Sequence, residues 1–196
     1  LVANYLKKTD SDYKVYAFEP YFKIYKKLKE NIDINPGLNK KIVVEKKALS
    51  ENINDKMKFE IISKNLGANF LKKIFNDKDE KDNHILITDT LDNYCFKNNI
   101  VDIKFIKIDV EGMELDILNG SENTINKFDP SIFIEVNENL YKDRNLSFVP
   151  YLDKFSKNKK KFFTENKITR NLEEKSKNEI LSILNENCTN FNLFIT

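Results

Sequence analysis

Histidine and cysteine are too scarce in this chain of 196 residues to build several common kinds of catalytic or metal site. His84 is the only histidine, which argues against a Ser-His-Asp triad and against a metal site with several histidine ligands. It precedes an apolar run and is interpreted as an ordinary strand-edge residue. Cys95 and Cys188 are too few and too far apart to suggest a disulfide framework or a zinc site. A reducing cytoplasm is therefore the simplest compartment.

Glycine is also scarce, and its positions provide no phosphate-binding turn. The four glycines are Gly37, Gly67, Gly112 and Gly120. No two of them form a G-x-G pair, and none precedes Glu19. Nucleotide-binding α/β domains normally carry a Gly-rich turn between their first strand and first helix, because the backbone amides there cradle phosphate groups. Such a turn is missing from this sequence.

The sequence has neither a long apolar run nor an excess of charge of one sign. No stretch approaches the roughly 20 apolar residues that a membrane-spanning helix requires. The 33 basic and 31 acidic residues give a formal net charge of +2, which offers no electrostatic case for binding nucleic acid. Hydrophobic residues make up 40% of the chain, enough for a buried core, and the length suits a single domain over residues 1–196.

Predicted strands alternate with predicted helices along most of the chain, which favours an α/β fold with a parallel or mostly parallel sheet. Strands are predicted over residues 14–18, 42–44, 57–62, 85–88, 104–108, 132–135, 162–163 and 191–195. The end of one helix is predicted within residues 1–8, and further helices are predicted after Pro20 and after Gly112. A short helix is predicted to begin at residue 91, and two more cover residues 148–155 and 173–186. The polar segment 65–82 is predicted to be an irregular loop or lid.

The run from Phe105 to Glu114 is the most informative part of the sequence. A short apolar strand ends in Asp109-Val110-Glu111-Gly112, and a helix follows at once. Acids at the carboxyl end of a buried strand, followed by a glycine that permits a tight turn, are typical of ligand crevices in open α/β sheets. If the backbone is still extended there, Asp109 and Glu111 face the same way and both reach the crevice.

These two carboxylates suit several roles. They can orient a sulfonium or an amine, take a proton from an attacking hydroxyl, or hold a divalent cation. A metal is the lesser alternative, because no histidine supports it and other ligands would have to come from distant strands. The structural alternative is that Glu111 and Glu114 cap the helix that follows.

Polar residues also follow two other predicted strands. Glu19 comes just after the first strand, where a carboxylate can accept hydrogen bonds from both hydroxyls of a ribose. Equally, it can be an acid placed favourably at a helix N-terminus. Glu135 and Asn137 end the strand that follows Pro130, where they either line an acceptor pocket or are surface polar residues.

Several motifs together resemble, in order and spacing, the FkbM family of S-adenosylmethionine-dependent methyltransferases. The resemblance covers roughly residues 1–137, and Ile106–Gly112 is its most specific part. The motifs are Ala17-Phe18-Glu19-Pro20, Asn31-Ile32, Lys47-Ala48-Leu49-Ser50, Thr90-Leu91-Asp92-Asn93-Tyr94, the run 104–114 and Leu118-x-Gly120-Ser121.

The resemblance implies a Rossmann-like seven-stranded methyltransferase fold, with a mostly parallel sheet and an antiparallel last strand. Members mostly methylate hydroxyl groups, often on sugars, glycans or polyketides, and use S-adenosylmethionine. By position, Glu19 looks like the ribose-binding acid, with Pro20 beside it, and Ala48 like a residue lining the adenine. Asp109 looks like the residue beside the methionine and the reactive methyl group. Glu111 is its neighbour, and these two acids are the catalytic candidates.

The resemblance also predicts what is missing. The family's first strand and its Gly-rich cofactor loop lie upstream of the helix that residues 1–8 are predicted to end. We therefore expect an N-terminal truncation, and a fragment that binds cofactor poorly by itself.

Two other functions remain open. An NAD- or nucleotide-sugar-binding Rossmann enzyme fits Glu19 but leaves the run Asp109–Gly112 unexplained. A decayed methyltransferase that serves as a non-catalytic interaction domain fits the missing strand. The expected partner of the favoured enzyme is a small-molecule or glycan acceptor.

Overall fold

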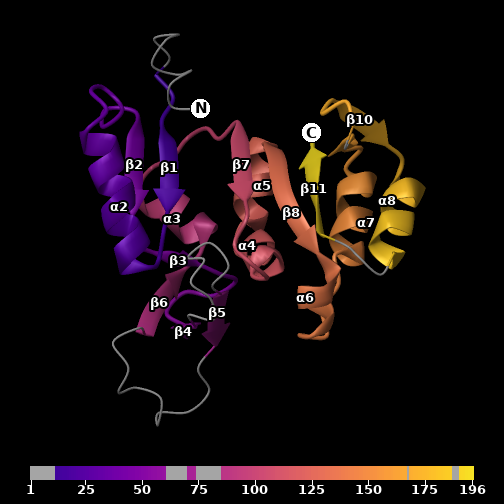
Figure 1. Ribbon diagram of the computed structural model, residues 1–196, viewed down its shortest axis with the longest axis horizontal. Coiled ribbons are helices and arrows are strands. Elements are labelled where there is room, and N and C mark those ends of the chain that lie inside the picture. The colour runs from indigo at the N-terminus through magenta and orange to yellow at the C-terminus, as the bar shows by residue number, and fades with distance from the viewer. Residues whose placement is uncertain (1–11, 61–69, 74–84, 167, 187–189) are drawn as a thin grey trace. The chain divides into compact units, whose positions relative to one another are not determined.

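The computed structural model describes residues 12–60, 70–73, 85–166, 168–186 and 190–196 (Figure 1). The helix end predicted within residues 1–8 lies outside this part of the chain. The chain divides into two compact units, Leu1–Asp89 and Thr90–Thr196, and each is described by itself. None of the described helices is long and apolar enough to cross a membrane.

The first unit contains a parallel strand pair joined by a helix, and a second small sheet. β1 pairs with β2 in parallel, and the small sheet has the order β3-β6-β4-β5. The elements are β1 (Val15–Phe18), α2 (Phe22–Asp33), β2 (Ile42–Glu45), β3 (Ala48–Leu49), β4 (Lys56–Glu60), β5 (Phe70–Lys73) and β6 (Ile85–Asp89). β5 falls within the segment predicted to be an irregular loop, so that prediction is wrong for residues 70–73.

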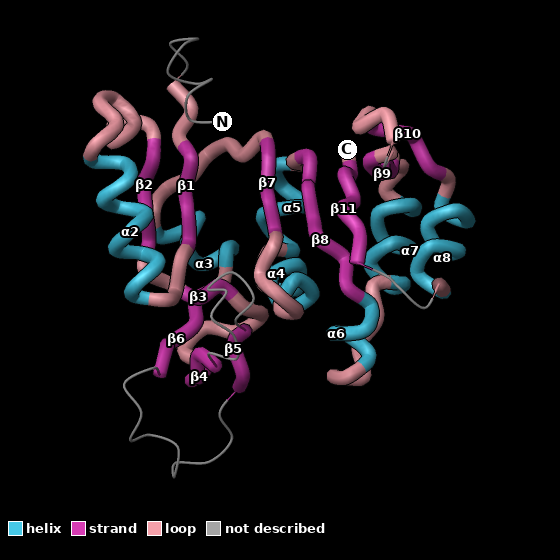
Figure 2. The backbone as a smooth tube through the Cα atoms, in the orientation of Figure 1, coloured by secondary structure: helices cyan, strands magenta, loops and turns pink. Residues whose placement is uncertain are grey.

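The second unit is built on a five-stranded sheet with the order β10-β9-β11-β8-β7 (Figure 2). Its strands are β7 (Phe105–Ile108), β8 (Ser131–Asn137), β9 (Phe162–Glu165), β10 (Leu172–Lys175) and β11 (Asn190–Ile195). Its helices are α3 (Leu91–Lys97), α4 (Glu114–Asn119), α5 (Glu122–Phe128), α6 (Glu138–Lys142), α7 (Val149–Lys157) and α8 (Lys177–Asn185).

Strand β8 organises the core of the second unit. Its side chains alternate, so Ile132, Ile134 and Val136 are completely buried on one face. Glu135 and Asn137, the two residues predicted to lie near a substrate, point to the other face and are half-buried. α4 packs against β8, and Leu115 on α4 is 1% exposed. One strand thus contributes both to the apolar core and to the polar end of the sheet.

The strand directions agree with the prediction only in part, because the expected antiparallel last strand is present but other antiparallel pairs were not expected. β7 and β8 are parallel, and the last strand β11 runs antiparallel to both of its neighbours, β8 and β9. β9 and β10 form a further antiparallel pair, and so do β4 with β5 and β4 with β6. Antiparallel pairings therefore outnumber parallel ones among the described strands, and the expected mostly parallel sheet is corrected to a mixed one.

Two predicted helices are also corrected. The segment predicted as one helix over 173–186 begins as strand β10, which pairs with β9, and only then becomes α8. Ser176 separates the two, because its hydroxyl and the Glu179 carboxylate form a capping box at the start of α8. The single helix predicted after Gly112 is two helices, α4 and α5, divided at Gly120 and Ser121.

The capping box gives a test of local stability. Ser176→Ala removes the acceptor for the Glu179 amide, and we expect it to lower the free energy of unfolding by about 1 kcal/mol. The matched control is Ser182→Ala, which changes an exposed serine inside the same helix and should be neutral or slightly stabilising. Urea denaturation of both variants measures the difference. Equal stability of the two would contradict the assigned start of α8.

Candidate functional site

The acids of the second unit gather where β7 and β8 end. The two strands are parallel, with Ile108 opposite Ile134, so Asp109 and Glu135 are the next residues on each strand. Burial raises the pKa of Glu135, and the nearby negative charge of Asp109 raises it further. The structure therefore brings together two residues that the sequence placed 26 positions apart, as the parallel arrangement predicted.

The backbone between β7 and α4 turns sharply. Glu111 and Gly112 both have left-handed backbone conformations, with φ of +57° and +102°. The premise that Asp109 and Glu111 continue an extended strand is therefore wrong, since β7 ends at Ile108. Burial raises the pKa of Glu111, and the negative charges of Glu135 and Asp109 raise it further, so the turn still leaves Glu111 within the electrostatic influence of both acids. A left-handed conformation is unusual for glutamate, and residues held this way cluster at functional sites.

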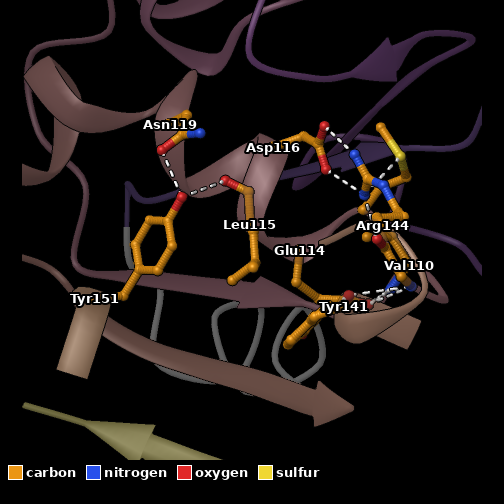
Figure 3. A network of polar contacts seen from close by, with 10 residues as sticks. Val110, Glu114, Leu115, Asp116, Asn119, Tyr141, Arg144 and Tyr151 are labelled. Atoms are coloured by element: carbon orange, nitrogen blue, oxygen red, sulfur yellow. Dashed lines mark hydrogen bonds and ion pairs between the residues drawn. The ribbon is translucent and has the colours of Figure 1, made fainter. Parts of the chain in front are cut away.

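Glu114 fixes this turn from within the protein. Its carboxylate is 1% exposed and accepts hydrogen bonds from the backbone N–H of Val110 at 3.1 Å and of Gly112 at 3.0 Å (Figure 3). The hydroxyl of Tyr141 donates to the same carboxylate at 3.1 Å and also lies 3.2 Å from the Glu135 carbonyl oxygen. Glu114 thus binds the turn that precedes α4, which is more than the helix cap considered from the sequence.

Arg144 also binds this turn, through the Gly112 carbonyl oxygen. Its guanidinium forms a two-point ion pair with Asp116, at 2.6 and 2.7 Å, and also donates to the Gly112 carbonyl oxygen at 2.7 Å (Figure 3). Asp116 is nearly buried, with 8% of its side chain exposed. Bidentate arginine–carboxylate pairs of this kind are among the stronger charged contacts in proteins.

Burial and mutual repulsion raise the pKa values of two carboxyls at the site. Burial raises the pKa of Glu111, and the charges of Glu135 and Asp109 raise it further. Burial also raises the pKa of Glu135, partly offset by a hydrogen bond from Asn190. Asp109 itself pairs with Lys107, whose ammonium lies 2.5 Å from one carboxylate oxygen. The site therefore combines two carboxyls that resist ionisation with a third that pairs with a lysine.

Asn137 has a local structural role. Its side-chain oxygen accepts from the backbone N–H of Leu140 at 3.4 Å and caps α6. The next residue, Glu138, is buried and accepts from the backbone N–H of Phe148 at 2.7 Å. Asn137 remains a predicted acceptor-binding residue, but the side chain is already engaged at the start of a helix.

The cofactor-binding candidates of the first unit lie on two of its strands. Glu19 directly follows β1, and its carboxylate accepts from the backbone N–H of Tyr21 at 2.7 Å. Burial raises the pKa of Glu19, and the bond from Tyr21 lowers it. Pro20 lies two residues before α2, and Ala48 is 2% exposed on β3, opposite Thr88. These residues belong to the first unit, whereas the acids after β7 belong to the second.

The described residues contain no group of three or more histidine, cysteine, aspartate or glutamate side chains arranged to hold a metal ion. Cys95, one of the two cysteines, is buried and free.

Comparison with known families identifies the chain. A family model described as the methyltransferase FkbM domain matches residues 1–189. The chain belongs to the FkbM methyltransferase family. The resemblance predicted from the Asp109–Gly112 run and the accompanying motifs is thereby confirmed, and the match extends beyond residue 137 into the five-stranded sheet.

A solved structure of the family shares the fold. The crystal structure of methyltransferase FkbM from Methylobacillus flagellatus KT superposes with a TM-score of 0.55 at 16% sequence identity. The comparison covers all of the present chain and 40% of the Methylobacillus protein. The present chain therefore spans well under half of that protein's length. A search of curated proteins gives no match.

Sequence reasoning missed the residues that hold the turn. Asp116 lies on α4, Tyr141 on α6, and Arg144 just after α6. The contacts that Tyr141 and Arg144 make with residues 112–116 span 27 to 32 positions of the sequence. One signal was available. Arg144 and Arg170 are the only arginines among 33 basic residues. In a chain so rich in lysine, an arginine indicates a contact that needs the several donors of a guanidinium.

The raised pKa of Glu111 gives a pH test. In the unfolded chain Glu111 ionises near its ordinary pKa of 4.5, whereas in the folded protein its pKa is raised. As pH rises from the first value through the second, the free energy of unfolding therefore falls. Glu111→Gln should therefore increase the free energy of unfolding at pH 7, by less than about 1 kcal/mol because the side chain is half-exposed. Near pH 3, where the carboxyl is protonated in both states, the variant should match the wild type.

Combining substitutions provides the control. Glu135→Gln should also stabilise at pH 7, and the double variant should gain less than the sum, because each carboxylate repels its neighbours. Thermal denaturation at the two pH values measures all three variants. A gain of the same size at both pH values would contradict the proposed repulsion.

Proposed function

We propose that this FkbM family chain transfers a methyl group from S-adenosylmethionine to a hydroxyl of a sugar, glycan or polyketide-like acceptor. Membership of a methyltransferase family and the acid-bearing turn after β7 support the proposal. The turn is the observation that carries it, because strained backbone and closely placed acids at the end of a parallel strand favour a binding and catalytic role.

We also propose that residues 1–196 belong to one methyltransferase domain with a Rossmann-like fold. The family model spans residues from both units, which favours one domain. In the second unit the order β7-β8-β11-β9, with β11 antiparallel to both neighbours, is compatible with such a fold.

Glu19 offers a fit for the ribose of the cofactor. Oε1 accepts from the Tyr21 amide, and within the described part of the chain Oε2 makes no hydrogen bond. A half-buried carboxylate oxygen of this kind suits a ribose hydroxyl. Pro20 beside it and the buried Ala48 are the other proposed cofactor contacts. When bound, S-adenosylmethionine supplies a methyl group on a positively charged sulfur.

Asp109 and Glu111 are the proposed catalytic pair. An attacking hydroxyl must lose its proton, and a carboxylate within hydrogen-bond distance can accept it. Glu111 is suited to this because its raised pKa makes it a stronger base once it is ionised. Asp109 is negatively charged in its ion pair with Lys107. The negative charge of Asp109 favours binding of a positively charged sulfonium. Most of the rate increase would come from holding the two reacting centres in contact.

Glu135 and Asn137 are proposed to contact the acceptor. Glu135 is half-buried beside Asp109, and carboxylates hydrogen-bond readily to sugar hydroxyls. The position of both residues at the end of β8, next to the turn after β7, supports this assignment.

Asp109→Asn tests the catalytic assignment. The substitution keeps size and removes charge, and we expect kcat to fall about 100-fold or more, within the range of general base and electrostatic effects. Methyl transfer from S-adenosylmethionine to hydroxyl-bearing acceptors is measured with the full-length protein. The control is Asp153→Asn on α7, which breaks only a surface ion pair with Lys177. Near-normal turnover of Asp109→Asn would remove it from the catalytic pair.

Glu19→Gln tests the cofactor site. Loss of one charge-assisted hydrogen bond to ribose should weaken S-adenosylmethionine binding by about 10- to 100-fold, measured by titration calorimetry. The control is Glu30→Gln on α2, where the carboxylate makes only an exposed contact with Lys26. Tighter binding of NAD than of S-adenosylmethionine to the unmodified protein would instead favour a dinucleotide-binding enzyme.

A further inference from the structure

The turn between β7 and α4 needs support from outside itself. Glu111 and Gly112 are both left-handed, and for a residue other than glycine this costs of the order of 1–3 kcal/mol. Such a conformation persists only where surrounding contacts enforce it. Glu114 satisfies the amides of Val110 and Gly112, but these bonds leave the Gly112 carbonyl oxygen to another partner.

Arg144 is that partner, and it reaches the turn from a distant part of the sequence. Its Nη1 atom donates to the Gly112 carbonyl oxygen at 2.7 Å and to Asp116 at 2.6 Å, while Nη2 donates to the other oxygen of Asp116 at 2.7 Å. The Asp116 pair fixes the plane of the guanidinium, and this aims the remaining bond at the turn (Figure 3).

The segment that carries Arg144 also covers the turn directly. A side chain at Gly112 would have its Cβ 3.4 Å from carbon atoms of Leu140 on α6. Tyr141, one residue later, donates to Glu114. Residues 140–144 therefore hold the turn through three contacts. Leu140 packs against Gly112, the Tyr141 hydroxyl donates to Glu114, and the Arg144 guanidinium donates to the Gly112 carbonyl oxygen.

We propose that Arg144, held by Asp116, is a positioning residue that sets the geometry of Glu111 and Asp109 for methyl transfer. It touches no reacting atom in this scheme and acts through the Gly112 carbonyl. The proposal rests on the function proposed above for the Asp109–Glu111 pair. A lysine would keep the charge but has a single nitrogen, which cannot reproduce both the two-point pair and the third bond.

Arg144→Lys and Asp116→Asn are the test variants. Each should lower kcat for methyl transfer about tenfold or more, as expected when reacting groups are slightly misplaced, while KM for S-adenosylmethionine stays near the wild-type value. The double variant should be no worse than the more impaired single variant, because both act through one ion pair.

Two controls separate positioning from stability. Arg170→Lys changes the only other arginine, which makes an exposed ion pair with Glu165, and should leave kcat unchanged. Ser176→Ala destabilises α8 without touching the turn and should likewise leave kcat unchanged well below its unfolding temperature. A kcat of Arg144→Lys that matches these controls would overturn the proposal.

A second measurement does not depend on turnover. The Glu111 carboxyl is titrated by NMR in the wild type and in Arg144→Lys, where the total charge is the same. Burial raises the pKa of Glu111, and the facing carboxylates of Glu135, Asp109 and Glu114 raise it further, so release of the turn should lower this pKa toward the ordinary value. An unchanged titration would overturn the proposal. If no acceptor is methylated by the wild type, the proposed function fails, and this titration alone decides the role of Arg144.

Discussion

The buried carboxylate of Glu114 is the interaction on which the site after β7 depends. A charged group that is 1% exposed is costly unless its oxygens are hydrogen-bonded, and here two backbone amides and the Tyr141 hydroxyl satisfy them. The same bonds dictate where the chain turns, because the amides of Val110 and Gly112 must both point at one side chain. The end of β7, the start of α4 and the position of α6 are thereby fixed together.

The cost of this arrangement is borne by the acids around it. The left-handed turn holds Glu111 near Asp109 and Glu135, and burial and repulsion raise the pKa of Glu111. Stability would be served better by separating these charges. The conflict between local preference and observed geometry is what is expected where a chain is shaped for binding or chemistry rather than for folding alone.

Sequence reasoning predicted those elements whose cause is local. The strands β1, β2 and β7 and the start of α3 at Leu91 were predicted from apolar runs and neighbouring polar residues. It failed where pairing decided the outcome. Residues 172–175 are a strand because β9 offers an edge to pair with, although their composition suits a helix.

The sequence by itself determined the family, the acids after β7 and their order along the chain, because these are properties of short motifs. Tertiary structure alone decided that Glu111 is left-handed, that Asn137 caps a helix, and that Tyr141 and Arg144 belong to the same site as Glu114. The physical reason is distance along the chain. A buried carboxylate and a backbone carbonyl will accept any donor that packing brings near, and no local pattern reveals which donor, some 30 residues away, that will be.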